Sequence, residues 1–395
     1  MTHRFPLLAF LVGAAFGLSA QAAPLKVYIL SGQSNMQGHA KTETIGVLED
    51  DPTCADMLAR MRTNDGSFTV CDDVWISAIG SSDEEKKGKL TVGFGPEGRG
   101  VKIGPEFTFG LRIRELEDGP VLIIKTAWGG KSLHTDFRSP SAGPFVFSTA
   151  QLERFKQQGK DIAKIKADKK AATGHYYRLM MAHVKKVLAD PGRVVPGYNP
   201  KDGFELAGFV WFQGWNDMVG GDVYPNRGKP GGYDAYSEVL AHMIRDVRKE
   251  LNTPKLPFVI GVMGAGGPVD QYPQSKMRYA GIHQSFRDAM AAPASLPEFK
   301  DTVVAVRTET CWDMPLQKLR DRDEELKRTI KEKIKSGAIG KEERAALEAA
   351  RAETFNAKEL RLMTEGVSNA EYHYLGSAKI LGRIGEAFAE AVHKL

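Results

Sequence analysis

Short, nearly continuous apolar segments alternate with longer segments of helical periodicity, and this alternation limits the fold more than any other feature of the chain. Strands that are apolar on both faces and separated by helices form parallel sheets covered on both sides. The sequence therefore predicts an α/β fold, a three-layer α/β/α sandwich around a central, mostly parallel sheet. The five expected strands lie at residues 26–30, 121–125, 209–212, 257–263 and 302–306.

A charged segment interrupts the alternation after the fifth strand. Residues 316–362 are rich in Lys, Arg, Glu and Ala and are broken near Ser336-Gly337. Charges of both signs at helical spacing are typical of solvated helices, so we expect a charged helical hairpin inserted before the last helix, which follows Gly376. We find no internal repeat and no long linker, which predicts one domain over residues 24–395.

The first 23 residues have the pattern of an export signal. His3 and Arg4 precede an apolar run at residues 7–18, and the small-x-small pattern Ala20-Gln21-Ala22 follows. A run of about a dozen residues is too short to span a bilayer, which needs about 20. We expect cleavage near Ala22-Ala23 and a soluble mature protein, periplasmic or secreted, without a membrane span.

Charge and cysteine content exclude two further classes of protein. The formal net charge of +5 over 395 residues is too mild to indicate a nucleic-acid partner. There is no Cys-x-x-Cys pair and no His-rich cluster, so no metal site is expected. An oxidising compartment permits a disulfide between Cys54 and Cys71, with Cys311 left over.

Three of the expected strands end in polar loops that contain glycine. In open parallel sheets the ligand site lies beyond the carboxyl ends of the strands, so these loops are expected to meet at one site. They are Ser31-Gly32-Gln33-Ser34-Asn35-Met36, Ala127-Trp128-Gly129-Gly130-Lys131-Ser132 and Gln213-Gly214-Trp215-Asn216-Asp217.

Ser34 is the candidate nucleophile, although a serine directly after a strand is also often only a helix cap. A nucleophilic serine needs a base for its proton and donors for the oxyanion that develops. His373, in the loop before the last helix, is the candidate base. Gly130 can offer a backbone N–H, and Gln213 or Asn216 a side-chain amide. Alternative bases are His39, His134 and His175.

These loops resemble the motif blocks of the SGNH hydrolase superfamily, and within it the sialate O-acetylesterases and acetylxylan-esterase-like carbohydrate esterases. Residues 32–35 match the Gly-Gln-Ser-Asn block with Ser34 as its serine, and Gly130 matches the oxyanion glycine of the second block. Residues 213–217 satisfy parts of both forms of the third block, Gln-Gly-Glu-(Ser/Thr)-Asp and Gly-x-Asn-Asp. The resemblance covers nearly the whole mature chain and implies a flavodoxin-like sandwich.

The last block departs from the family pattern Asp-x-x-His. Ala370 stands three residues before His373, and Glu371 stands two before it. Either Glu371 orients the imidazole, or a distant acid such as Asp313 or Glu309 does, or a backbone carbonyl does so in a Ser–His dyad.

Further side chains are expected to shape the substrate site. The indoles of Trp128, Trp215 and Trp312 can stack on sugar faces, or they can cap the core. Arg307 can hold the carboxylate of an acidic sugar, or it can pair with Asp313. The matched blocks add Gln33, Asn35 and Asp217 as substrate-binding residues.

The resemblance implies an exported carbohydrate O-acetylesterase that hydrolyses acetyl esters on sialic acid or on plant or algal polysaccharide. The acyl-enzyme mechanism would use Ser34 and His373 without metal or organic cofactor. The alternative is a non-catalytic carbohydrate-binding protein on an esterase fold, which the missing acid favours. A lipid or thioester substrate is a third possibility, and no apolar lid segment supports it. The oligomeric state stays open.

Overall fold

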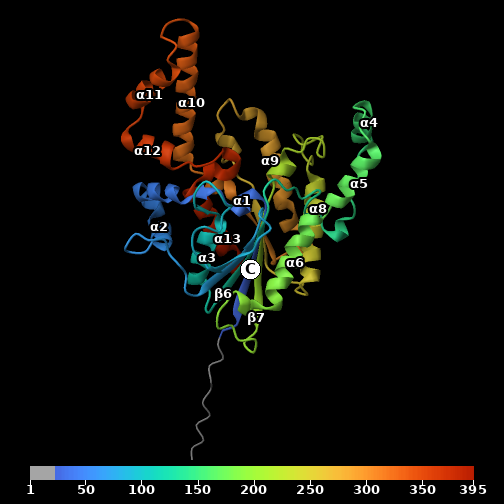
Figure 1. Cartoon of the computed structure of the whole chain (residues 1–395). Helices are drawn as coiled ribbons and strands as arrows, with labels where there is room; N and C mark the ends of the chain where they lie inside the picture. Colours follow the sequence, from blue (N-terminus) through green and yellow to red (C-terminus); the bar gives the residue numbers. More distant parts are fainter. Residues whose placement is uncertain (1–22) are drawn as a thin grey trace, which may run out of the picture.

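A seven-stranded sheet forms the centre of the computed structural model, which describes residues 23–395 (Figure 1). The predicted export signal lies outside these residues, apart from Ala23. The strand order is β4-β3-β6-β1-β7-β8-β9, and every neighbouring pair is parallel except β3 and β4. The strands are β1 (Leu25–Gly32), β3 (Val74–Ile79), β4 (Lys86–Lys89), β6 (Val121–Ala127), β7 (Phe204–Phe212), β8 (Phe258–Val262) and β9 (Val303–Arg307).

All five expected strands are present, and the predicted mostly parallel sheet is confirmed. The sheet has two further strands, β3 and β4, in a segment without an expected strand. β4 consists of Lys86-Lys87-Gly88-Lys89 and lies at the exposed edge, where charged side chains are typical. A short antiparallel ribbon joins β2 (Ala40–Lys41) to β5 (Lys102–Ile103).

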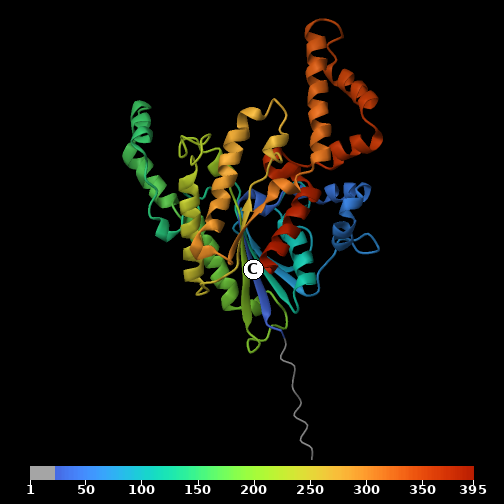
Figure 2. The ribbon, with the colours of Figure 1, turned by 180° about the vertical axis from the view of Figure 1, so that it is seen from behind.

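Helices cover both faces of the sheet (Figures 1 and 2). Residues of β1 alternate between two cores: Tyr28 and Leu30 lie in one, Val27 and Ile29 in the other. This alternation is what a strand buried on both faces requires, and it confirms the three-layer sandwich. On the first face lie α2 (Ala55–Met61), α3 (Pro105–Leu116) and α13 (Ala378–His393), and on the second α6 (His175–Ala189), α8 (Asp234–Glu250) and α9 (Met277–Ala291).

The last helix, α13, packs very closely on α3. A Cβ atom at Gly385 would lie 2.2 Å from Oγ1 of Thr108 and 2.3 Å from the carbonyl oxygen of Pro105, so only glycine permits this approach. The Thr108 hydroxyl also donates to the carbonyl of Gly382 at 2.8 Å. This contact fixes the start of α13, and with it the turn that carries His373.

The predicted charged insertion is present and is made of three helices rather than two. They are α10 (Met314–Lys335), α11 (Glu343–Thr354) and α12 (Ala357–Glu365), and the expected break at Ser336-Gly337 ends α10. Arg351 and Asp323 join α11 to α10 through two hydrogen bonds of 2.6 Å. The insertion projects from the main body, as does a separate arm formed by α4 (Thr149–Gln157) and α5 (Ile162–Ala172) (Figure 1).

Two predicted or permitted features can be compared directly with the described residues. Cys54, Cys71 and Cys311 are buried free thiols, so the permitted Cys54–Cys71 disulfide is not formed. No helix within residues 23–395 is both long and apolar enough to cross a bilayer.

Candidate active site

Ser34 is the first residue of the short helix α1 (Ser34–Gln37), directly beyond the carboxyl end of β1. The turn into α1 depends on Gly32, because a Cβ atom there would lie 2.1 Å from the carbonyl oxygen of Phe212. Ser34 is 7% exposed, and its hydroxyl makes no hydrogen bond to any residue in the described range. The hydroxyl of Ser34 therefore lies at the carboxyl end of β1 without a hydrogen-bond partner in the described residues.

A buried ion pair holds α1 in place from below. The ammonium group of Lys125 donates to the carbonyl of Gln37 at 2.8 Å, to that of Phe94 at 2.9 Å and to the carboxylate of Glu106 at 2.7 Å. Both charged side chains are buried, and burial lowers the pKa of Lys125 against the opposing effect of Glu106. Lys125 thus connects β6, α3 and the end of the serine helix.

His373 lies on the turn η9 (Glu371–Gly376), which contacts α1. Its Nδ1 atom is 3.0 Å from Oδ1 of Asn369. That oxygen also accepts from the backbone N–H of Ala370 at 2.8 Å, which fixes the orientation of the amide. Nδ1 must therefore carry the ring proton, and the lone pair of Nε2 is left available to accept one.

His39 lies face to face with His373. The ring centroids are 4.0 Å apart and the planes differ by 3°. Burial lowers the pKa of His373 to about 4, and burial followed by the charge of His373 lowers the pKa of His39 to about 3. Both imidazoles are therefore neutral near neutral pH, as a general base must be.

None of the acids considered from the sequence forms a hydrogen bond or ion pair with His373 in the described residues. The carboxylate of Glu371 accepts from Lys276 at 2.8 Å, so the expectation that it orients the imidazole does not hold in this structure. Asp313 accepts from the backbone of Leu316 at the start of α10 and pairs with Lys379 at 2.8 Å.

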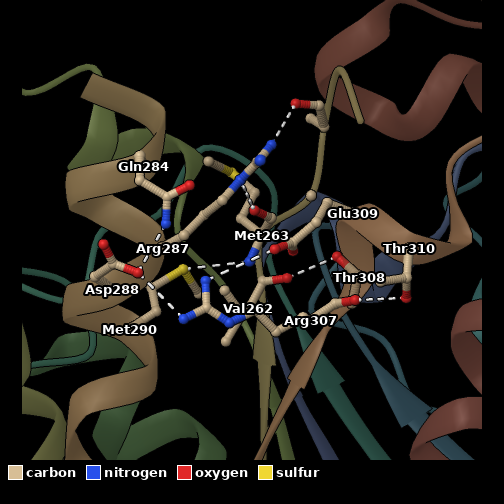
Figure 3. Close-up of polar contacts among 12 residues, drawn as sticks. Val262, Met263, Gln284, Arg287, Asp288, Met290, Arg307, Thr308, Glu309 and Thr310 are labelled. Atoms are coloured by element: carbon tan, nitrogen blue, oxygen red, sulfur yellow. Dashed lines mark hydrogen bonds and ion pairs between the residues drawn. The ribbon is translucent and has the colours of Figure 1, made fainter. Parts of the chain in front are cut away.

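The third acid, Glu309, lies near the end of β9, 3.7 Å from Arg307 (Figure 3). The orienting position belongs instead to Asn369, which sequence reasoning missed. An asparagine can orient a catalytic histidine as an acid does. Asn369, four residues before His373, was therefore the feature of the sequence that could have identified this role.

Two glycines follow β6, and the first of them, Gly129, lies next to the serine. A Cβ atom at Gly129 would be 3.8 Å from Cβ of Ser34 and 3.0 Å from Oε1 of Gln37, whereas one at Gly130 would meet nothing within 4 Å. Gly130 has a φ of 73°, a conformation that favours glycine. The backbone N–H of Gly130 donates no hydrogen bond to any residue in the described range.

Gln213 and Asn216, in the loop after β7, differ in their hydrogen bonding. The side-chain amide of Gln213 donates to Asp217 at 2.6 Å, to the carbonyl of Lys131 at 3.1 Å and to Gln33 at 3.2 Å. Its two protons are therefore already committed. Asn216 is half-buried, and its side chain has no hydrogen-bond partner among residues 23–395. Asn216 is thus the amide that is free to bind a ligand.

Asp217 is fully buried and does not reach a substrate. Its carboxylate accepts from the backbone N–H groups of Leu133 and His134, at 2.7 and 3.0 Å, and from the Tyr224 hydroxyl at 3.0 Å. These bonds and the one from Gln213 join the loops after β6 and β7. Asp217 therefore shapes the site rather than binding substrate, contrary to expectation.

Several other expected substrate contacts are buried. Trp128 is 2% exposed and donates to Asp83, and Trp312 is 3% exposed and donates to Gln317, so both indoles cap the core. Gln33 and Asn35, the chain neighbours of Ser34, are buried. Of the three tryptophans, only Trp215 is half-buried rather than buried.

Arg307 is not available as a free carboxylate receptor. Its guanidinium lies 3.1 Å from Asp288 of α9 and is directed toward that helix (Figure 3). It pairs with Asp288 and Glu309, and not with Asp313. Of the alternative bases, His39 alone lies against His373, while His134 packs against Phe145 and Tyr224.

Two proteins of known structure have a low similarity to the chain. The chain is similar, at 15% identity over 72% of its length, to a protein from Arabidopsis thaliana, of which 86% is covered, with a TM-score of 0.37. It is also similar to a carbohydrate acetylesterase from Xanthomonas citri, at 15% identity over 71% of this chain and 49% of that one, with a TM-score of 0.38. No curated sequence is similar enough to match.

A family model matches residues 24–296, which include Ser34, Gly130, Gln213 and Asn216 but not His373. The matched family is described as "Carbohydrate esterase, sialic acid-specific acetylesterase". This supports hydrolase activity on acetyl esters of carbohydrates and confirms the resemblance noted in the sequence. Because the model matches well over half of the chain, the protein belongs to this family of carbohydrate esterases.

Proposed function

We propose that the protein hydrolyses O-acetyl esters of sugars with Ser34 as nucleophile and His373 as base. The observation that carries the proposal is the hydrogen bond between His373 Nδ1 and Asn369 Oδ1, on a turn that contacts the helix of Ser34. It leaves Nε2 as the proton acceptor. An apo structure need not show the serine–histidine hydrogen bond already formed, because such bonds often tighten only when substrate binds.

In the first step, Oγ of Ser34 forms a bond to the acetyl carbonyl carbon while its proton passes to Nε2 of His373. The carbonyl oxygen becomes an oxyanion. When the tetrahedral intermediate collapses, the bond to the sugar oxygen breaks, and the proton moves from Nε2 to that oxygen. The sugar leaves with a free hydroxyl, and the acetyl group stays on Ser34.

In the second step, a water molecule gives a proton to Nε2 and its oxygen attacks the acetyl-enzyme. A second oxyanion forms and collapses, Ser34 recovers the proton, and acetate leaves. We assign the oxyanion donors to the N–H groups of Ser34 and Gly130 and to the amide of Asn216. The support for Asn216 over Gln213 is that its amide is unengaged, whereas that of Gln213 is held by three acceptors.

The test is release of acetate from acetylated xylan and from O-acetylated sialic acid by Ser34→Ala. We expect a loss of about 1,000-fold or more in kcat, with residual activity from the oxyanion donors. Ser82→Ala, at an exposed serine beyond β3, is the matched control and should keep full activity. Full activity of Ser34→Ala would overturn the nucleophile assignment.

A serine-reactive phosphonate separates this enzyme from a carbohydrate-binding protein on the same fold. Labelling of the native protein at Ser34, and its absence in Ser34→Ala, is the expected result. Binding of acetylated sugars without labelling and without acetate release would favour the non-catalytic alternative.

We further propose that residues 1–23 direct export. The support is the pattern of a short apolar run followed by Ala20-Gln21-Ala22. Expression of the full chain followed by fractionation and N-terminal sequencing should give a periplasmic or secreted protein that begins near Ala23. An intact N-terminus in the cytoplasm would contradict the proposal.

A further inference from the structure

Two aromatic side chains from distant segments meet beside His373. The ring of Tyr372 lies edge to face with that of His373, with 4.5 Å between centroids and 68° between planes. The ring of Trp215 packs against Tyr372 at 5.5 Å with a tilt of 40°. We call Trp215 and Tyr372 the aromatic pair. It adjoins the candidate base directly.

The aromatic pair is open to solvent. Tyr372 is 42% exposed, and Trp215 is half-buried at the margin of both cores. Neither the phenol hydroxyl of Tyr372 nor the indole N–H of Trp215 has a hydrogen-bond partner among the described residues. Exposed aromatic surface beside a candidate reactive site is a place where a ligand is expected to bind.

The chain also holds both rings in position. Glu371, next to Tyr372, forms an ion pair of 2.8 Å with Lys276 just before α9. Gly214, next to Trp215, is enclosed, because a Cβ atom there would lie 2.8 Å from the ring of Phe286. The aromatic pair is therefore fixed on two sides before any ligand arrives, which lowers the entropy cost of binding.

We propose that the aromatic pair is the platform on which the sugar ring of the ester substrate lies. The proposal rests on the proposed function, because the ester must be placed at Ser34 and His373 while its sugar occupies the adjoining surface. A pyranose has a C–H face that packs on an aromatic ring and a rim of hydroxyls. Tyr372 and Trp215 offer both an apolar face and an unengaged polar atom for such a ligand. The side-chain amide of Asn216, the residue after Trp215, can form hydrogen bonds with the same sugar hydroxyls.

Substrates with and without a sugar test the platform. Ethyl acetate carries the same acetyl group and no ring, so it measures the catalytic residues alone. The sugar ester is whichever of acetylated xylo-oligosaccharide and O-acetylated sialic acid the native protein hydrolyses with the higher kcat/KM. For Trp215→Ala we expect KM on the sugar ester to rise roughly tenfold, with kcat/KM on ethyl acetate changed less than about threefold.

Conservative and matched variants separate binding from damage to the site. Tyr372→Phe keeps the ring and loses only the hydroxyl, so KM on the sugar ester should rise less than in Tyr372→Ala. Tyr279→Ala removes a tyrosine with the same 42% exposure from α9 and should change neither substrate. Tyr372→Ala should resemble Trp215→Ala on the sugar ester.

Three results would overturn the platform. They are an unchanged KM in Trp215→Ala, an equal loss on ethyl acetate and the sugar ester, and hydrolysis of ethyl acetate without hydrolysis of either sugar ester. Each leaves the esterase mechanism intact, because the native protein still hydrolyses ethyl acetate. Failure of the mechanism gives a different signature: ethyl acetate hydrolysis is then absent from the native protein or unaffected in Ser34→Ala.

Discussion

His39 and His373 stack with ring centroids 4.0 Å apart and planes 3° from parallel, so each imidazole covers one face of the other. The two rings cannot both be positively charged imidazolium ions without strong repulsion. The stack therefore favours the neutral state that a general base needs, and we expect it to influence the pH dependence of the proposed activity.

The first prediction concerns that pH dependence. Burial lowers the pKa of His373 to about 4, so kcat/KM on an acetate ester should rise as pH increases through about 4 and stay level to neutral pH. His39→Ala admits water to the ring of His373, raises its pKa toward 6.5 and moves the acid limb to higher pH. His39→Phe keeps a ring without a charge and should keep the native profile. An unmoved acid limb in His39→Ala would contradict the interpretation of the stack.

A second prediction concerns Asn369. Asn369→Ala removes the acceptor of the His373 Nδ1 proton and should lower kcat by about 10 to 100-fold with little change in KM. Asn369→Asp keeps an acceptor and adds a negative charge, which favours the imidazolium. It should retain activity and shift the acid limb to higher pH. Unchanged kcat in Asn369→Ala would remove Asn369 from the mechanism.

A third prediction separates the two amides after β7. Asn216→Ala should lower kcat by about 100-fold, the usual effect of losing one oxyanion donor, with an unchanged melting temperature. Gln213→Ala removes the link between Gln33, Lys131 and Asp217, so it should lower the melting temperature as well. Measured kcat and thermal unfolding of the two variants distinguish these roles. Native kcat in Asn216→Ala would reassign the donor.

A fourth prediction concerns the buried pair of Lys125 and Glu106. Lys125→Met leaves a carboxylate buried without its partner and should lower the free energy of unfolding by about 3–5 kcal/mol. Adding Glu106→Gln should restore part of that loss. The exposed pair of Lys164 and Asp168 is the control, and Lys164→Ala should change stability by less than about 1 kcal/mol. Urea unfolding measures all three, and equal effects of the two lysine variants would contradict the role of burial.

A fifth prediction concerns stability in acid. Burial lowers the pKa of His183 and His283, as of His373, to about 4. Between pH 6.5 and 4 the unfolded chain binds protons that the folded chain does not. The free energy of unfolding should therefore fall as the pH decreases from 6.5 to 4. Above pH 6.5 these groups are neutral in both states and make no such contribution. Chemical unfolding at several pH values measures the slope.

The sequence was sufficient to predict the central sheet because its inner strands are apolar on both faces. β3 was missed because Ser77 interrupts its apolar run and charged β4 follows it. The insertion was predicted from its charges, but its division into three helices depends on a cap at Asn356 that lies inside the charged segment.

The candidate site was predictable where it follows strand ends and not where it depends on irregular backbone. Tyr374 and Leu375 both adopt positive φ, which is uncommon for such residues, and the turn they form brings Asn369 to His373. Sequence spacing cannot show this. The sequence also does not show which side chains are exposed. Trp128 and Trp312 lie near strand ends, as Trp215 does, and are nevertheless buried.

The close packing of α13 on α3 has a consequence for how activity appears during folding. Ser34 follows the first strand, whereas His373 lies on the turn that α13 holds down, so the two reactive groups are joined by some of the longest-range contacts in the chain. During synthesis the serine side is made first, so we expect the proposed hydrolysis to begin only after α13 docks. Recovery of esterase activity after dilution from denaturant would therefore report the completion of folding, later than the signals of the sheet.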